Sequence, residues 1–171
     1  LVIRRDDLVG NVRRSAEADW QFYVDRSSGP VDKGDWLMTP QTNDAYNGSL
    51  RDIVFPAGIL QPPIFDPNAD PAINYGGVGG IIGHELTHGF DDEGRKIDAD
   101  GALRDWWTAD DAKRFTALTE ALGKQYSSYE AAPGVFINGT LTMGENIGDM
   151  SGLEVAYEAY KMSLNGKPAP V

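Results

Sequence analysis

The sequence contains no cysteine and only two histidines. The absence of cysteine excludes disulfide bonds, thiolate metal ligands and cysteine nucleophiles from the chemistry of these 171 residues. It also removes any indication of a redox compartment. Whatever histidine chemistry the chain performs must therefore use the same two side chains.

Basic residues are scarce relative to acidic ones. The chain holds 15 Lys and Arg residues against 26 Asp and Glu residues, which gives a formal net charge of −11. Because such a chain repels phosphate backbones and anionic lipid headgroups, we expect no nucleic-acid partner. No apolar run approaches the roughly 18 residues that a membrane helix needs, and no signal peptide is visible. We therefore expect no membrane contact from this segment.

Length and composition predict a soluble globular domain. A chain of 171 residues lies within the roughly 100–200 residues of one domain. Its hydrophobic fraction of 41% and charged fraction of 24% are close to the usual balance of globular proteins. We expect residues 1–171 to form a single domain with a core of its own.

Apolar periodicity predicts a first and a last helix, over about 6–26 and 145–164. The first should bury one face, formed by Val9, Val12, Ala16, Trp20 and Tyr23. The last should bury a stripe formed by Ile147, Met150, Leu153, Tyr157, Tyr160 and Leu164. A further helix should follow Thr108, an N-cap residue, and end before Ala132-Pro133-Gly134. The remaining long stretch, 31–75, is irregular, with a strand signal at 53–55.

A glycine-rich helix is predicted from Gly76 or Gly77 to Phe90. Its first half contains five glycines, each of which costs up to about 1 kcal/mol relative to alanine. Packing must therefore hold this helix, and we expect it to be central and buried. Gly148 and Gly152 of the last helix would let the two backbones approach closely.

The chemically informative stretch lies in this helix and reads His84-Glu85-Leu86-Thr87-His88. Positions i and i+4 of a helix share one face, so two imidazoles can bind one metal ion from a rigid scaffold. Glu85 sits beside them, within reach of a metal-bound water. Two nitrogen ligands, an open position and a carboxylate base are what a hydrolytic zinc site needs.

A third protein ligand would have to be a carboxylate, because no histidine or cysteine remains. Glu145 is a candidate, since it follows Gly144 and opens the last helix, and Asp149 lies one turn later on the same face. Glu145 would bind the metal, and Asp149 would accept the outer N–H of a ligand histidine. Both could equally be solvated acidic residues near a helix N-terminus, where the helix dipole favours them.

Several further stretches give the sequence a family resemblance. These are Ile53-Val54-Phe55-Pro56-Ala57-Gly58-Ile59-Leu60-Gln61-Pro62-Pro63, Gly83 to Asp92, Asp98, Asp100-Gly101, Asp105-Trp106-Trp107-Thr108 and Gly144-Glu145-Asn146-Ile147-Gly148-Asp149. Over most of residues 31–171 the chain resembles the neprilysin-like zinc metallopeptidases of family M13, which are gluzincins. Gly148 stands where the family's Glu-Asn-Ile-Ala-Asp motif has alanine.

The resemblance implies one Zn²⁺ per chain, with His84, His88 and Glu145 as ligands, Glu85 as the catalytic carboxylate and Asp149 as the supporting carboxylate. It implies a zinc-dependent endopeptidase that hydrolyses bonds in short peptides through an activated water. The expected fold class is α+β, a zincin-like, thermolysin-type core with a small irregular sheet and several helices around the His-Glu-x-x-His helix.

The family also carries an Asn-Ala-Tyr-Tyr segment that binds the substrate backbone like an added strand. Here the region reads Asn43-Asp44-Ala45-Tyr46-Asn47. Counting forward from the upstream Thr-Pro-Gln-Thr places Asp44 at the asparagine, whereas counting back from Ile-Val-Phe places Asn43 there. The resemblance therefore implies Asn43, Asp44 and Ala45 as substrate-binding residues, with a register open by one residue. The Ala45-Tyr46 match favours Asp44.

A larger departure concerns what lies outside these residues. The family's transition-state histidine and its arginine for the substrate carboxylate come well after the third ligand, and its helical N-terminal domain comes before. We expect the chain to be the central part of a catalytic domain, weakly active or inactive without the N- and C-terminal parts of the full-length enzyme. The absence of cysteine favours a soluble bacterial protein, cytoplasmic or secreted, over a membrane-anchored one.

Other functions fit some of the same residues. The first is a zinc-binding interaction module without catalysis. The second is a calcium-binding domain that uses the acidic loop from Asp91 to Gly101, although this loop lacks a closing glutamate at the right distance. A nucleotide site in the glycine run lacks the Gly-Lys-Ser/Thr ending that phosphate loops need.

Overall fold

The computed structural model describes residues 1–30, 32, 34–48 and 52–170, and the chain divides into two compact units, Leu1–Trp36 and Leu37–Val171. The first unit contains helix α1, Leu8–Ser27, which begins after Asp7, whose side chain accepts the N–H of Gly10. The predicted helix is confirmed, but its predicted buried face is wrong. None of the described residues of α1 is buried, and Trp20 is 71% exposed, because a single helix offers its apolar side chains nothing to pack against within its unit.

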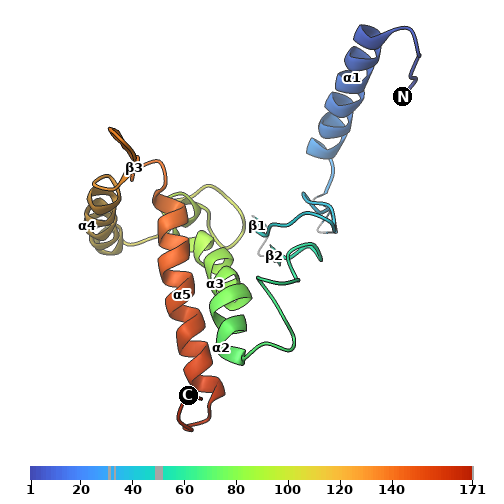
Figure 1. Ribbon diagram of the computed structural model, residues 1–171. Coiled ribbons are helices and arrows are strands. Elements are labelled where there is room, and N and C mark those ends of the chain that lie inside the picture. Colours follow the sequence, from blue (N-terminus) through green and yellow to red (C-terminus); the bar gives the residue numbers. More distant parts are fainter. Residues whose placement is uncertain (31, 33, 49–51, 171) are drawn as a thin grey trace. The chain divides into compact units, whose positions relative to one another are not determined.

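The second unit contains two short antiparallel ribbons. Strand β1, Tyr46–Gly48, pairs with β2, Asp52–Val54, with Tyr46 opposite Val54. Strands β3, Glu130–Ala132, and β4, Val135–Phe136, form a hairpin in which Gly134 has φ +75°. The sequence predicted only a break there, because the ribbon is too short to show a period. Helices with these small sheets (Figure 1) confirm the α+β class.

The glycine-rich helix begins earlier than predicted and changes its winding twice. It runs through α2, Pro71–Asn74, a π-helical turn, Tyr75–Gly79, α3, Gly80–Thr87, and a 3₁₀ turn, His88–Phe90. Asp70 caps its start by accepting the N–H of Ala72 at 2.8 Å, and proline is favoured in the first turn. The Asp-Pro pair was thus the start signal, and the predicted end at Phe90 is confirmed.

A 3₁₀ turn, Gly94–Lys96, and a loop lead to α4, Ala109–Tyr126. The predicted N-cap is confirmed, because the hydroxyl of Thr108 accepts the N–H of Asp111 at 3.1 Å. Trp107 packs edge-on against Phe115 of α4, with ring centroids 5.3 Å apart. This contact fixes the start of the helix against the loop that precedes it.

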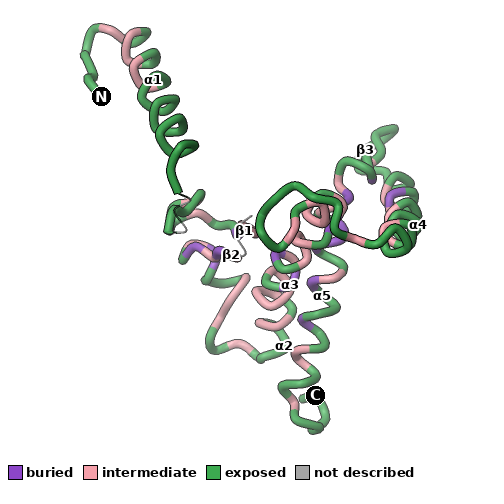
Figure 2. The backbone as a smooth tube through the Cα atoms, turned by 180° about the vertical axis from the view of Figure 1, so that it is seen from behind, coloured by how far each residue is buried: buried purple, intermediate pink, exposed green. Residues whose placement is uncertain are grey.

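Helix α5, Met143–Ser163, packs along α3 (Figure 1), and buried positions gather where the two face each other (Figure 2). A Cβ atom at Gly83 would lie 2.6 Å from the carbonyl oxygen of Gly152, so the two backbones touch as predicted. The predicted apolar stripe of α5 is wrong in part: Ile147 is buried, but Leu153 is 57% exposed. The face with small residues is the buried one, because only it allows this close approach.

Among the described residues, no helix has both the length and the apolar content needed to span a bilayer.

Candidate metal centre

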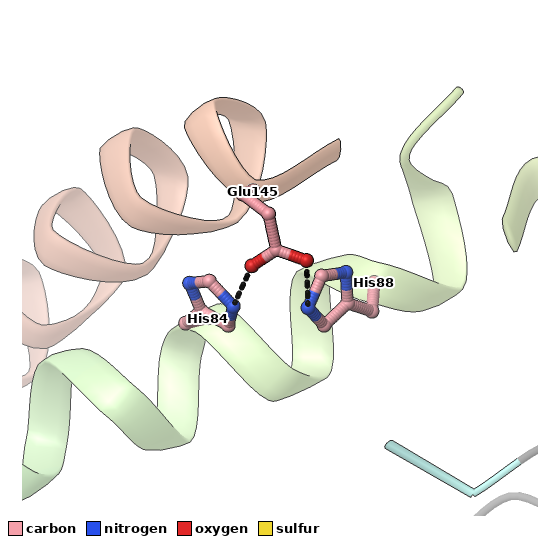
Figure 3. A group of neighbouring side chains, drawn as sticks. All are labelled: His84, His88 and Glu145. Atoms are coloured by element: carbon pink, nitrogen blue, oxygen red, sulfur yellow. Dashed lines mark ion pairs between the residues drawn. The ribbon is translucent and has the colours of Figure 1, made fainter. Parts of the chain in front are cut away.

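Helices α3 and α5 bring three potential metal ligands together. His84 and His88 lie one turn apart on α3, and Glu145 of α5 points between them (Figure 3). The Nε2 atoms of His84 and His88 lie 3.3 Å and 3.9 Å from the two carboxylate oxygens of Glu145. One ligand atom from each residue lies within 4.8 Å of the other two. The arrangement could hold one metal ion.

Gly148 of α5 lies directly against the imidazole of His84. A Cβ atom at Gly148 would lie 2.8 Å from Nδ1 of His84, so any larger residue would push the imidazole or the helix aside. Glu145 approaches both imidazoles, and Asp149, one turn later on α5, contacts His84.

Each histidine forms a hydrogen bond through its Nδ1 atom with a carboxylate. Nδ1 of His84 lies 2.8 Å from Asp149, and Nδ1 of His88 lies 2.7 Å from Asp91. The Asp91 carboxylate also accepts the N–H groups of Glu93 and Gly94 at 2.9 Å and 2.6 Å. Such partners hold the proton on Nδ1 and leave the lone pair of Nε2 free, which is the tautomer a metal ligand needs.

Sequence reasoning did not single out Asp91 as a partner of His88. The available signal was its position three residues after His88, the spacing at which side chains near a helix end meet. The structure also places Asp149 beside His84, where the sequence had put it. The roles of these two carboxylates toward a bound metal stay predictions.

Burial and neighbouring charges shift the pKa values of two groups in the centre. Burial raises the pKa of Glu85, and the adjacent His88 and His84 only partly offset this effect; the residue is 5% exposed. Burial lowers the pKa of His88, but its hydrogen bond to Asp91 and the nearby carboxylates more than compensate, so the pKa ends above its usual value. A raised carboxyl pKa suits a group that must both take up and release a proton.

The donor set fits zinc. Two imidazole nitrogens and one carboxylate oxygen are the ligands of catalytic zinc sites, which keep a further position open. The side chain of Glu145 is 69% exposed, so the centre is accessible from solvent. The tautomers imposed by Asp91 and Asp149 direct both Nε2 lone pairs toward Glu145, as this set requires.

The predicted substrate segment lies next to this centre. An amide N–H of Asn47, on β1, donates to the carbonyl oxygen of Glu85 at 2.5 Å, which ties the strand to the histidine helix. Ala45 is buried, whereas Asn43 and Asp44 are exposed. The sequence had not identified Asn47, and no pattern within the chain marks it.

The acidic loop considered for calcium has a different organisation. The Asp98 carboxylate accepts the N–H groups of Asp100 and Ala102 at 2.8 Å and 3.0 Å and pairs with Arg104 at 2.9 Å. Its oxygens are thus used by donors of the protein itself, as in an ordinary Asx-type turn. Within the described residues, the metal-ligand grouping is the one formed by the two histidines and Glu145.

Comparison with known proteins agrees with this geometry. The model of peptidase family M13 matches residues 43–171. The chain is 43% identical to human endothelin-converting enzyme 1 over 152 residues, which is 88% of this chain and 20% of that protein. It is 41% identical to human neprilysin over 161 residues, 92% of this chain and 22% of that protein. The chain thus spans about a fifth of the length of these curated relatives.

The solved structures include a strong match. The zinc metalloprotease Zmp1 of Mycobacterium tuberculosis, crystallised in complex with an inhibitor, superposes with a TM-score of 0.92 at 53% sequence identity. The match covers 100% of this chain and 27% of Zmp1. With the family model matching residues 43–171, the chain belongs to peptidase family M13.

Proposed function

We propose that this chain carries the metal site and the catalytic carboxylate of a zinc-dependent endopeptidase that hydrolyses short peptides. The observation that carries the proposal is the convergence of His84, His88 and Glu145, with the buried Glu85 between the two histidines in the sequence. Membership of a peptidase family supports the same reading. The full enzyme would include further parts of an M13 polypeptide, which we expect as partners of this segment.

One Zn²⁺ per chain would be held by His84, His88 and Glu145. Asp91 and Asp149 would orient the two imidazoles and increase their basicity, as carboxylates behind ligand histidines do. When bound, zinc lowers the pKa of a water at its open position toward about 7 and polarises the scissile carbonyl. The donor chemistry and the fixed tautomers support this assignment.

Glu85 would act as the general base and then the general acid. Its carboxylate takes a proton from the attacking water and passes it to the leaving nitrogen as the peptide bond breaks. Its burial and raised pKa support both halves of this cycle, because the protonated form is more accessible than in an ordinary glutamate.

The peptide would lie extended along the segment from Asn43 to Ala45 and the strand that follows. Strand β1 pairs with β2 along one edge, and among the described residues no strand pairs with its other edge. An open edge of this kind accepts an extended peptide as an added strand. Whether Asn43 or Asp44 meets the substrate backbone depends on the register, and peptide binding by Asn43→Ala and Asp44→Ala would distinguish the two.

The test is a cleavage assay on the zinc-loaded chain with an internally quenched fluorogenic peptide. Both histidines of the chain belong to the metal group, so no third histidine stabilises the oxyanion. Loss of such a donor costs a factor of about 10²–10³, and we expect slow cleavage. Glu85→Gln should keep its zinc and abolish cleavage, whereas Glu154→Gln, a charge-matched control at an exposed position of α5, should leave the rate unchanged.

Two outcomes would contradict the proposal. Cleavage retained in Glu85→Gln would remove Glu85 as the base. A parent chain that binds no zinc, even when zinc is added in excess, would remove the metal site on which the proposal rests.

A further inference from the structure

Three Asn-Gly pairs occur in the sequence, at 47–48, 138–139 and 165–166. An asparagine before glycine is chemically labile, because the backbone nitrogen of the glycine can attack the side-chain amide carbon, and glycine has no Cβ atom to hinder the approach. The attack requires a glycine N–H and an asparagine side chain that are both free to move. The structure treats the three pairs differently in these two respects.

The Asn138-Gly139 pair is held by hydrogen bonds at both reacting groups. The N–H of Gly139, which is buried, donates to Oγ of Ser127 at 3.1 Å. The side-chain oxygen of Asn138 accepts two backbone N–H groups at 3.2 Å and 3.1 Å, those of Thr140 and Leu141. Neither the nitrogen nor the amide carbon can approach the other without breaking these bonds.

The Asn47-Gly48 pair is fixed by the ribbon and by the histidine helix. Asn47 lies in β1 opposite Ile53 of β2, so its backbone is held extended. Its side-chain amide donates to the carbonyl oxygen of Glu85 at 2.5 Å. The amide carbon is therefore held by a contact with α3 that the reaction would have to break.

The Asn165-Gly166 pair has neither constraint. Both residues are exposed just beyond the end of α5, and among the hydrogen bonds between described residues none uses the N–H of Gly166. The Asn165 amide makes one long bond, to the carbonyl oxygen of Ser163 at 3.3 Å. Asn165 also has φ +50°. Because left-handed backbone is unfavourable for residues with a side chain, the local conformation does not oppose the rotation that the reaction needs.

We propose that Asn165 is a site of spontaneous modification, at which its side-chain amide is converted to a carboxyl group with water as the co-reactant. The Gly166 nitrogen loses its proton to a solvent base and attacks Cγ of Asn165. The new N–Cγ bond forms as the Cγ–Nδ2 bond breaks, and the amide group takes up a proton and leaves as ammonia. Water then opens the cyclic imide at either carbonyl, which gives aspartate or isoaspartate without any oxidation or reduction.

The modification adds one negative charge to a chain whose formal net charge is −11. The charge appears at the C-terminal end of α5, where the helix dipole disfavours an anion. Glu145 lies near the opposite end of this helix, roughly 30 Å away at the rise of a straight α-helix. The modification thus changes the charge of the chain at a distance from the proposed metal ligands.

The experiment incubates the folded chain at mildly alkaline pH in zinc-containing buffer made with water enriched in heavy oxygen. Peptide mapping by mass spectrometry in ordinary water then follows each asparagine with time. Conversion during incubation carries the label, whereas conversion during digestion does not. The same chain unfolded in guanidinium chloride reports the reactivity of the three pairs without the fold. Ser127→Ala frees the N–H of Gly139, and Asn165→Gln lengthens the reacting side chain.

In the folded chain Asn165 should convert at least about tenfold faster than Asn138 or Asn47, since the other two must first break hydrogen bonds. The three rates should converge in guanidinium chloride. Ser127→Ala should speed conversion at Asn138 and leave Asn165 unchanged, and Asn165→Gln should remove the signal at position 165.

Two results would overturn the inference. The first is conversion at Asn165 that is no faster than at the other two asparagines of the folded chain. The second is an equally large difference in the unfolded chain, because the local sequence alone would then explain it. Both comparisons are made within the parent chain, so they do not depend on the folding of a variant. Neither result bears on the proposed peptidase function, which makes no use of Asn165.

Discussion

Helix α1 and the helix pair α3–α5 show opposite relations between apolar content and burial. Helix α1 carries Val9, Trp20 and Tyr23 on its predicted face, yet all three are exposed. The pair α3–α5 meets through glycines, with Gly83 of α3 against Gly152 of α5. Apolar periodicity thus predicts that a helix forms, whereas the close contact of two backbones decides which face is buried. The metal residues lie where the backbones are closest.

The largest effect should come from breaking this contact. In Gly83→Ala the new Cβ would lie 2.6 Å from the carbonyl oxygen of Gly152. Relieving this clash requires a shift of the helix backbone, which costs free energy. We expect a loss of about 1–3 kcal/mol of unfolding free energy, in the range of overpacked cores, together with weaker zinc binding. Urea unfolding and zinc titration measure both.

The matched control is Gly80→Ala, one turn earlier on the same helix, where a Cβ meets nothing within 4 Å. That variant should gain up to about 1 kcal/mol from helix propensity. Equal losses in the two variants would show that the glycines matter for some reason other than the contact with α5.

The next largest effect concerns the carboxylates behind the histidines. Removing such a partner typically weakens metal binding by about 10- to 100-fold, and we expect this for both Asp91→Ala and Asp149→Ala. Asp91 should have the larger effect, because it is buried and fixed by two backbone N–H groups, whereas Asp149 is exposed. Competition with a chromophoric chelator gives the affinities; an unchanged affinity in Asp91→Ala would contradict its orienting role.

A smaller effect is expected from the buried charge on α3. In the metal-free chain, the pKa of Glu85 is raised by burial, so its ionised form destabilises the fold at neutral pH. Glu85→Gln should therefore unfold with a free energy higher by on the order of 1 kcal/mol at pH 7. The difference should shrink as pH falls through the raised pKa toward 4.5, since the native carboxyl then takes up its proton.

The corresponding change in α1, Glu17→Gln, removes one partner of an exposed ion pair with Arg13 and should be near neutral at every pH. Chemical unfolding across this pH range compares the two variants. A Glu85→Gln variant that is less stable than the parent at pH 7 would show that the glutamate has stabilising partners when ionised.

The smallest effect is expected on α1 itself. Trp20→Ser removes a large apolar side chain that is 71% exposed, and surface changes of this kind stay within about 0.5 kcal/mol. Thermal unfolding of the chain should detect no more than that. A loss of several kilocalories per mole would mean that Trp20 is buried in solution.

The sequence predicted where the helices lie more reliably than it predicted which face of each helix is buried. Helix positions, the Thr108 cap, and the approach of the glycines in α5 to α3 were all readable, because each depends on local chemistry or on residue size. The exposure of Leu153 was not, since it depends on which side of α5 the glycines turn toward α3.

The same contrast holds at the metal centre. His84 and His88 were readable from a spacing of four, which a helix converts into proximity. Glu145 was indicated by its place at the start of a helix and by the family resemblance, and α5 brings it to the two histidines. Asp91 meets His88 across a short turn, and Asn47 reaches the backbone of Glu85 through one amide hydrogen bond. Neither contact produces a repeating pattern in the sequence.

The most direct test of the central claim is the metal content of the chain, measured by mass spectrometry on protein purified without chelators. We predict close to one zinc per chain, lost in Glu145→Ala and retained in Glu154→Ala on the same helix. Zinc retained by Glu145→Ala, or absent from a parent chain that also shows no rise in melting temperature when zinc is added, would contradict a three-ligand site formed by α3 and α5.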